Sequence, residues 1–133
     1  VAAAGAIWLP DDPYVLKRHN HAVMAFAALE AWPHPNQALP IVAVLHDPAH
    51  YWRVQKQGAA LAMAGHLHGG QMVWTRNNAG RLLPAGWIYR LNVLRFKHAQ
   101  CELVVSRGCA DTLPVRWRCP REVVLCELEP GLE

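Results

Sequence analysis

The sequence lacks an apolar run long enough to cross a lipid bilayer. Its longest apolar runs cover residues 1–10, 41–45 and 59–64, whereas a membrane-spanning helix needs about 20 residues. No positive charge precedes the first run and acidic residues follow it, which is not how a secretory signal is built. We therefore expect no membrane span in this segment. Localisation, whether cytoplasmic or membrane-associated, depends on what precedes Val1.

Cysteine pairs with the spacing of a zinc knuckle or a thioredoxin-type motif are also absent. The chain has four cysteines, and no two of them form a C-x-x-C pair. Four cysteines have three possible pairings if they are oxidised. We expect them to serve mainly as small buried apolar residues. They are Cys101, Cys109, Cys119 and Cys126.

Charged residues are sparse but unevenly distributed. Of the 133 residues, 53% are hydrophobic and 17% are charged, which predicts a single folded domain or part of one. Residues 71–121 hold eight arginines and one lysine against two acidic residues, although the net charge of the chain is only +3. Arginine binds phosphate in a bidentate manner, so this cationic stretch favours an anionic partner. The alternative is a set of solvated strand faces.

The N-terminal residues 1–39 are predicted to form a helical lead-in. Asp12 is a suitable helix cap and Pro13 is a suitable first helical residue. The apolar residues that follow have helical spacing, and the prolines from residue 33 onward mark the end of the helix. These apolar residues are Val15, Ala22, Phe26 and Leu29.

Residues 40–71 predict a strand, a helix and a second strand. Residues 41–45 form a β-branched run without polar alternation, as in a strand buried on both faces. Residues 48–57 suit a short helix that ends at Gly58, and residues 59–64 form the next apolar run. The sequence therefore predicts an α/β fold with a βαβ-like unit.

Residues 72–133 predict short β-strands separated by turns. The expected strands cover residues 87–94, 102–106 and 123–128, with a turn at 77–80. Aromatic residues alternate with arginines in this region, a pattern that occurs where bases stack in nucleic-acid binding. We favour core packing and expect no nucleic-acid partner apart from a possible substrate. These aromatic residues are Trp87, Tyr89, Phe96 and Trp117.

Histidines follow both strands of the βαβ-like unit. His46 ends the first strand, and His66 and His68 follow the second. Ligands gather at the carboxyl ends of strands in open α/β sheets, and in an extended segment His66 and His68 would point to the same side. Imidazole binds zinc, manganese and iron. The residues alone leave two possibilities, a metal site or a turn with exposed histidines.

The longer string GHLHGGQ at residues 65–71, here called the GHLHGGQ segment, is more specific. It resembles the last ligand motif of the calcineurin-like metallophosphoesterases, particularly a bacterial subgroup in which it commonly reads GHTHGGQ. Residues 41–48 resemble that family's apolar strand followed by H-D-P. Residues 104–108 and 113–123 are similar to its closing strands and turn, in the same order.

The resemblance implies a hydrolase with a two-metal centre. His46 and His66 would bind one divalent cation and His68 the other, and the cations would be manganese, iron or zinc. Two such cations activate a water molecule that attacks a phosphate mono- or diester. The resemblance implies no further catalytic residue in this half. Residues expected beside the metals or the substrate are Gly65, Gly69, Gly70, Gln71, Asp47 and His50.

The sequence also departs from that family. Leu67 replaces the usual threonine, and Arg121 stands where many members have a proline. The motifs D-x-H, G-D-x-x-D and G-N-H-D/E, which supply the family's other ligands, do not occur. We therefore expect this chain to be a C-terminal fragment, inactive alone, whose partners are the missing N-terminal half and a phosphate-bearing substrate.

The resemblance further implies a fold in which two sheets pack face to face between helices, in αββα layers, with the short strands of residues 72–133 closing the second sheet. Half of such a sandwich exposes apolar faces and unpaired strand edges, so we expect poor solubility or self-association. The alternative is a stand-alone chain without catalysis that binds anions or pairs with another subunit. A sharp cooperative melt would favour that alternative.

Overall fold

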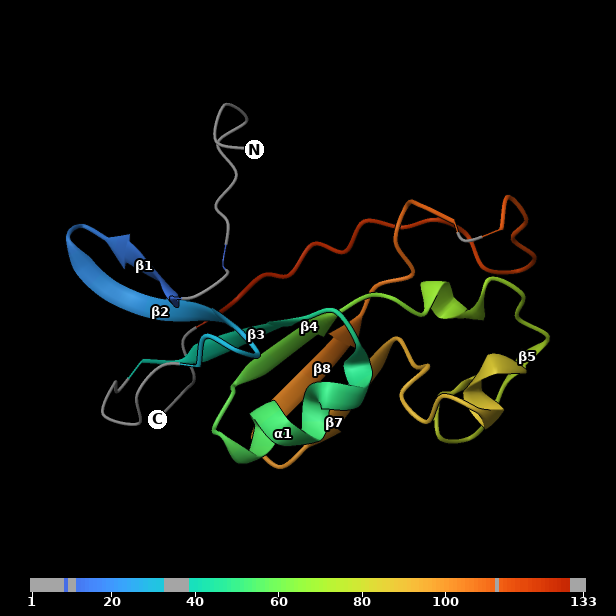
Figure 1. The fold of residues 1–133 in the computed structure, drawn as a ribbon, viewed down its shortest axis with the longest axis horizontal. Helices are drawn as coiled ribbons and strands as arrows, with labels where there is room; N and C mark the ends of the chain where they lie inside the picture. The colour runs from blue at the N-terminus through green and yellow to red at the C-terminus, as the bar shows by residue number, and fades with distance from the viewer. Residues whose placement is uncertain (1–8, 10–11, 33–38, 112, 130–133) are drawn as a thin grey trace.

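The structure is a computed structural model that describes residues 9, 12–32, 39–111 and 113–129. Its main element is a six-stranded sheet in the order β1-β2-β3-β4-β8-β7 (Figure 1). Strands β2, β3, β4 and β8 are parallel, and β1 and β7 pair antiparallel at the two edges. The coarse prediction of a mixed α/β fold is therefore confirmed. The strands are β1 (Tyr14–Arg18), β2 (His21–Ala28), β3 (Ile41–Leu45), β4 (Leu61–Ala64), β7 (Arg95–His98) and β8 (Cys101–Val105).

The predicted strand-helix-strand unit is present. A 3-10 turn η2 (Pro48–His50) and the helix α1 (Tyr51–Lys56) connect β3 to β4. Asp47 begins this connection, because its Oδ1 accepts a hydrogen bond of 2.8 Å from the amide of Ala49. Gly58 follows the helix with a φ of +89°, a left-handed conformation that glycine adopts without strain.

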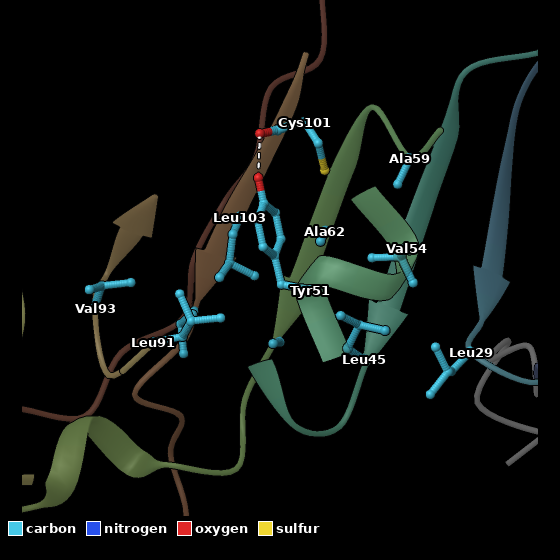
Figure 2. Packing of buried hydrophobic residues seen from close by; sticks show 13 residues of the cluster. Leu29, Leu45, Tyr51, Val54, Ala59, Ala62, Leu91, Val93, Cys101 and Leu103 are labelled. Carbon is cyan, nitrogen blue, oxygen red and sulfur yellow. Dashed lines mark hydrogen bonds between the residues drawn. The ribbon is translucent and has the colours of Figure 1, made fainter. Parts of the chain in front are cut away.

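The core lies between α1 and one face of the sheet. Tyr51 and Val54 of α1 are fully buried in one cluster with the small residues Ala43 and Ala62. Small residues let the helix approach the sheet closely, as at Ala62 (Figure 2). The hydroxyl of Tyr51 donates a 2.9 Å hydrogen bond to the carbonyl of Cys101. Burial raises the pKa of both Tyr51 and Cys101. Tyr51 thus joins α1 to β8 through a buried hydrogen bond.

The opposite face of the sheet is only partly covered. Val44 of β3 is 41% exposed on this face. The C-terminal residues 122–128 run back along the sheet as an extended segment (Figure 1). A cavity of about 380 Å³ is lined by residues of this segment and of β4 and β8. Val123 and Leu125 of this segment are 87% and 94% exposed. The predicted strand at 123–128 is therefore extended but is not paired in a sheet.

The predicted helix after Asp12 is wrong. Residues 14–28 instead form the antiparallel hairpin of β1 and β2. His19 and Asn20 both have positive φ, +49° and +67°, as a two-residue hairpin turn of type I′ requires. Ala25 and Ala27 are fully buried, so the strand's two-residue period outweighs the helical spacing. The rest of the predicted lead-in, residues 1–8, 10–11 and 33–38, lies outside the described residues.

The prediction that residues 72–133 close a second sheet is also wrong. Strands β7 and β8 lie in the main sheet beside β4. A separate two-stranded ribbon consists of β5 (Thr75–Arg76) and β6 (Leu82–Leu83), joined by the predicted turn, in which Asn77 Oδ1 accepts the amides of Ala79 and Arg81 at 3.0 Å.

The strand predicted at residues 87–94 is replaced by the 3-10 turn η4 (Ala85–Trp87) and irregular backbone. Its amides bond locally, as in the 2.9 Å bond from Trp87 to the carbonyl of Pro84, so they are not available for a sheet. Phe96 packs against the core as expected, whereas the other three aromatic residues are exposed. Core packing is therefore the wrong prediction for Trp87, Tyr89 and Trp117.

Within the described residues, no helix combines the length and the apolar character that a bilayer crossing requires.

Candidate metal centre

The candidate site lies where β3, β4 and β8 end. Because these strands are parallel, their carboxyl ends meet at one edge of the sheet. The amide of Gly65 donates to the carbonyl of His46 at 3.3 Å, and the amide of Ser106 donates to the carbonyl of Ala64 at 2.9 Å. These bonds continue the sheet into the loops that carry the candidate residues.

His46 and His66 lie together at this edge. The centroids of their imidazole rings are 4.4 Å apart, and the ring planes are inclined by 46°. Both residues are exposed to solvent. Their nitrogen atoms are thus available to an incoming ligand.

His68 lies on the side of the site near β8. A Cβ atom added at Gly108, in the loop after β8, would be 3.9 Å from Nδ1 of His68. The carbonyl of His68 accepts hydrogen bonds from the amide of Gln71 at 3.1 Å and from Sγ of Cys119 at 3.3 Å. Among the residues that the structure describes, no group of three or more His, Cys, Asp and Glu side chains is arranged to hold a metal ion.

The backbone of the GHLHGGQ segment is not extended, contrary to the sequence prediction. His66, His68 and Gln71 have φ values of +66°, +48° and +55°. Residues other than glycine rarely adopt this left-handed region. A 3-10 turn, η3 (His68–Gly70), therefore replaces the extended strand that would place His66 and His68 on the same side.

Gly69 and Gly70 are needed for close packing. A Cβ atom at Gly69 would lie 2.7 Å from Sγ of Cys119 and 2.8 Å from Cγ of Arg107. At Gly70 a Cβ atom would lie 2.6 Å from the Cβ of Ala85. The two glycines thus let the loop after β8 and the turn η4 hold the GHLHGGQ segment from both sides.

Gln71 fastens the GHLHGGQ segment to a distant loop. Its Nε2 donates to the carbonyl of Leu113 at 2.6 Å, and its Oε1 accepts the amide of Leu113 at 3.3 Å. The amide of Trp117 donates to the backbone carbonyl of Gln71 at 3.0 Å. The side chain that sequence analysis placed beside the substrate therefore makes structural hydrogen bonds here.

The other three candidates, Asp47, His50 and Gly65, lie in the loops and the turn that follow β3 and β4. The Asp47 carboxylate accepts the helix-capping bond described above, so one of its oxygens is engaged. His50 is exposed at the start of α1, and its side chain makes no capping hydrogen bond. Gly65 has open space where a Cβ atom would be, with no heavy atom within 4 Å.

Asn92, which no sequence motif singles out, supports the GHLHGGQ segment through a hydrogen bond to Gly69. It is fully buried, and its Nδ2 donates to the carbonyls of Leu82 at 2.9 Å and Gly69 at 3.5 Å. Its Oδ1 has no hydrogen-bond partner among the described residues. Because the two partners are 10 and 23 residues away, no local pattern in the sequence reveals this contact.

Two groups of ion pairs hold the loop after β8. The amide and guanidinium of Arg107 donate to the two carboxylate oxygens of Glu122. Asp111 pairs with both Arg116 and Arg121. The hydrogen bond from Arg107 lowers the pKa of Glu122, and the hydrogen bond from Arg116 lowers that of Asp111. These residues keep the loop beside His68.

The ion pairs also limit the cationic character that the composition indicates. Four of the eight arginines in residues 71–121 are paired with carboxylates. The other four form no ion pair within the described residues. They are Arg76, Arg81, Arg90 and Arg118.

No family model matches the chain, and no curated protein or solved structure matches it. Support for a function therefore comes from the motif pattern and from the geometry at the carboxyl edge of the sheet.

Proposed function

We propose that the protein is a metal-dependent phosphoesterase that hydrolyses phosphate mono- or diesters. The observation that carries the proposal is the His46–His66 pair, whose rings lie 4.4 Å apart at the ends of adjacent parallel strands. Neutral imidazole is a ligand of zinc, manganese and iron. Two imidazoles at the ligand-binding edge of an α/β sheet supply two of the donors that a divalent cation needs.

The strained backbone of the GHLHGGQ segment supports the same function. Residues other than glycine in the left-handed region cluster at functional sites, where the surrounding structure must hold them. Here His66, His68 and Gln71 adopt that conformation within six residues. Gln71 and the packing around Gly69 hold them in place. A fold that maintains this strain fixes the direction of both imidazoles.

His68 is the proposed ligand of a second cation, as the resemblance to the calcineurin-like metallophosphoesterases implies. When both cations are bound, they acidify the attacking water and neutralise charge on the phosphoryl oxygens. The residues of this chain orient the ligands: the ion-paired loop after β8 supports His68, and the hydrogen bond between Gly65 and His46 joins the two loops. Carboxylate donors are expected from an N-terminal part of the domain.

We also propose how this sheet fits into a complete domain. We assign the six-stranded sheet to one layer of a metallophosphoesterase sandwich. The partly uncovered face that bears Val44 and the extended residues 122–128 would receive the other sheet. This arrangement supplies both the partner for the exposed face and the missing ligands.

Hydrolysis of bis(p-nitrophenyl) phosphate by the protein as its gene encodes it, in the presence of Mn²⁺, tests the proposal. His66→Ala should lower kcat/KM by roughly two orders of magnitude or more, because a metal ligand supports several kcal/mol of transition-state stabilisation. His21→Ala is the matched control. His21 is exposed at the N-terminal end of β2, whereas the candidate site lies at the carboxyl ends of the parallel strands. Near-normal turnover by the His66→Ala variant would exclude the proposed function.

A further inference from the structure

A second, cationic cavity is lined in part by Arg107. It has a volume of about 240 Å³. Three of its seven lining residues are arginines. We call it the arginine cavity, and it is lined by Val73, Trp74, Thr75, Arg76, Leu82, Arg107 and Arg118.

The arginine cavity carries more positive than negative charge. Arg107 is paired with Glu122, but Arg76 and Arg118 have no ion-pair partner among the described residues. In addition, Nε of Arg107 is buried and donates no hydrogen bond in that part of the chain. A buried donor without an acceptor is costly, and an anion in the cavity would remove that cost.

Two of the three guanidinium groups, those of Arg118 and Arg107, are held in position by contacts within the protein. Nη1 of Arg118 donates to the carbonyl of Trp74 at 3.1 Å, and its guanidinium carbon lies 5.6 Å from the centre of the Trp117 ring. The Glu122 carboxylate orients Arg107. Preorganised donors lose little conformational entropy on binding, and the planar guanidinium suits the geometry of a phosphate group.

The arginine cavity adjoins the candidate metal centre. The side chain of Arg107 lines the cavity and also packs on Gly69, where an added Cβ atom would lie 2.8 Å from its Cγ. Gly69 directly follows His68. Arg107 therefore lines the cavity and also contacts the GHLHGGQ segment one residue after His68.

We propose that the arginine cavity binds a phosphate group, with Arg76, Arg118 and Nε of Arg107 as the donors. This phosphate is distinct from the one at the metal centre. The consequence for the substrate rests on the proposed function: the preferred substrate carries a second phosphate group next to the scissile ester. Binding of phosphate itself requires neither metal nor hydrolysis, so the two proposals fail separately.

Equilibrium dialysis of the metal-free chain against radiolabelled inorganic phosphate, at fixed ionic strength, tests the cavity. We expect saturable binding that weakens about tenfold in Arg76→Gln and in Arg118→Gln, because each removes a charge-assisted hydrogen bond. Arg107→Lys should also weaken binding, since it keeps the charge but loses the Nε donor. Arg90→Gln is the matched control, because exposed Arg90 does not line the cavity.

Non-saturable binding, or an equal loss in Arg90→Gln, would overturn the proposal. Arg118 also makes structural contacts, and its variant could be lost to misfolding for that reason alone. In that case the test rests on the phosphate affinity of the Arg76→Gln variant. Arg76 is exposed on the short strand β5 and makes no ion pair in the described chain. Unchanged phosphate affinity in a folded Arg76→Gln variant would exclude Arg76 from the site and overturn the assignment.

Discussion

At the scale of single residues, the geometry of the candidate site depends on a glycine, Gly69, at a position where no side chain fits. Gly69 combines a φ of +65° with contacts that leave no room for a Cβ atom. Its neighbours in the GHLHGGQ segment, His66 and His68, accept the same strained conformation with full side chains. Close packing at Gly69 thus helps to hold the backbone that carries the two histidines.

Gly69→Ala should lower the free energy of unfolding by about 2–5 kcal/mol. Left-handed backbone costs a residue with a Cβ about 1–2 kcal/mol, and overpacking adds about 1–3 kcal/mol. Gly58→Ala is the control, because Gly58 also has positive φ but has no heavy atom within 4 Å of an added Cβ atom. Urea unfolding measures both variants. Equal losses in the two would contradict the packing role of Gly69.

At the scale of elements, the loop after β8 is held by ion pairs and not by secondary structure. Arg107 at its start and Glu122 at its end are 15 residues apart in sequence but share two hydrogen bonds. The amide of Glu122 also donates to the carbonyl of Gly108 at 3.2 Å. Loss of the Glu122 charge should therefore loosen the loop beside His68.

The stability of the chain should fall in acid partly through Glu122. Its pKa lies below the ordinary value of 4.5 because Arg107 donates to it. A depressed folded-state pKa stabilises the fold above pH 4.5, and this contribution disappears as the pH falls through the lower, folded-state pKa. Glu122→Gln should lower the free energy of unfolding by about 1 kcal/mol at neutral pH and flatten its acid dependence.

Thermal unfolding at a series of pH values measures this effect. Glu127→Gln serves as the control, because Glu127 is exposed and forms no ion pair within the described residues. If the unfolding temperature falls equally steeply with decreasing pH in the Glu122 variant and in the wild-type chain, the ion pair does not contribute to stability.

The strand-helix-strand unit could be predicted from sequence, whereas the N-terminal hairpin could not. The β-branched run of β3 and the capping residue Asp47 carry strong local signals. In residues 14–28, alanine-rich sequence satisfies both the helical and the strand periods, and Asp12-Pro13 mimics a helix start. The pair His19-Asn20, suited to a two-residue turn, was the available signal for the hairpin.

In the candidate site, too, some residues could be predicted from sequence and others could not. His46 and His66 could be brought together from sequence, because the ends of parallel strands meet at one edge. The hydrogen bonds of Gln71 to Leu113 and of Asn92 to Gly69 join residues 42 and 23 positions apart. Contacts of that range depend on the tertiary fold, so the supporting residues could not be predicted.

At the scale of the whole molecule, the sheet has one well-packed face and one partly open face. Helix α1 covers the first, and the extended residues 122–128 lie over part of the second. Exposed Val123 and Leu125 present apolar side chains next to backbone that has no strand partner among the described residues. Such a segment favours edge-to-edge association.

We therefore expect this chain to self-associate. Sedimentation velocity should show a mass that rises with protein concentration. A variant with Val123→Lys and Leu125→Lys should sediment as a monomer, because charge on an edge strand opposes pairing. Gln100→Lys, in the exposed turn between β7 and β8, is the charge-bearing control. A wild-type chain that stays monomeric and melts cooperatively would instead favour a stand-alone, non-catalytic module.

The metal content of the encoded protein decides whether His66 and His68 are ligands of a two-metal centre. After loading with Mn²⁺ and dialysis, elemental mass spectrometry should find about two equivalents in the wild-type protein and in the His21→Ala control. His66→Ala and His68→Ala should each lose about one equivalent, because the two histidines are assigned to different cations. Wild-type metal content in both His66→Ala and His68→Ala would contradict the account.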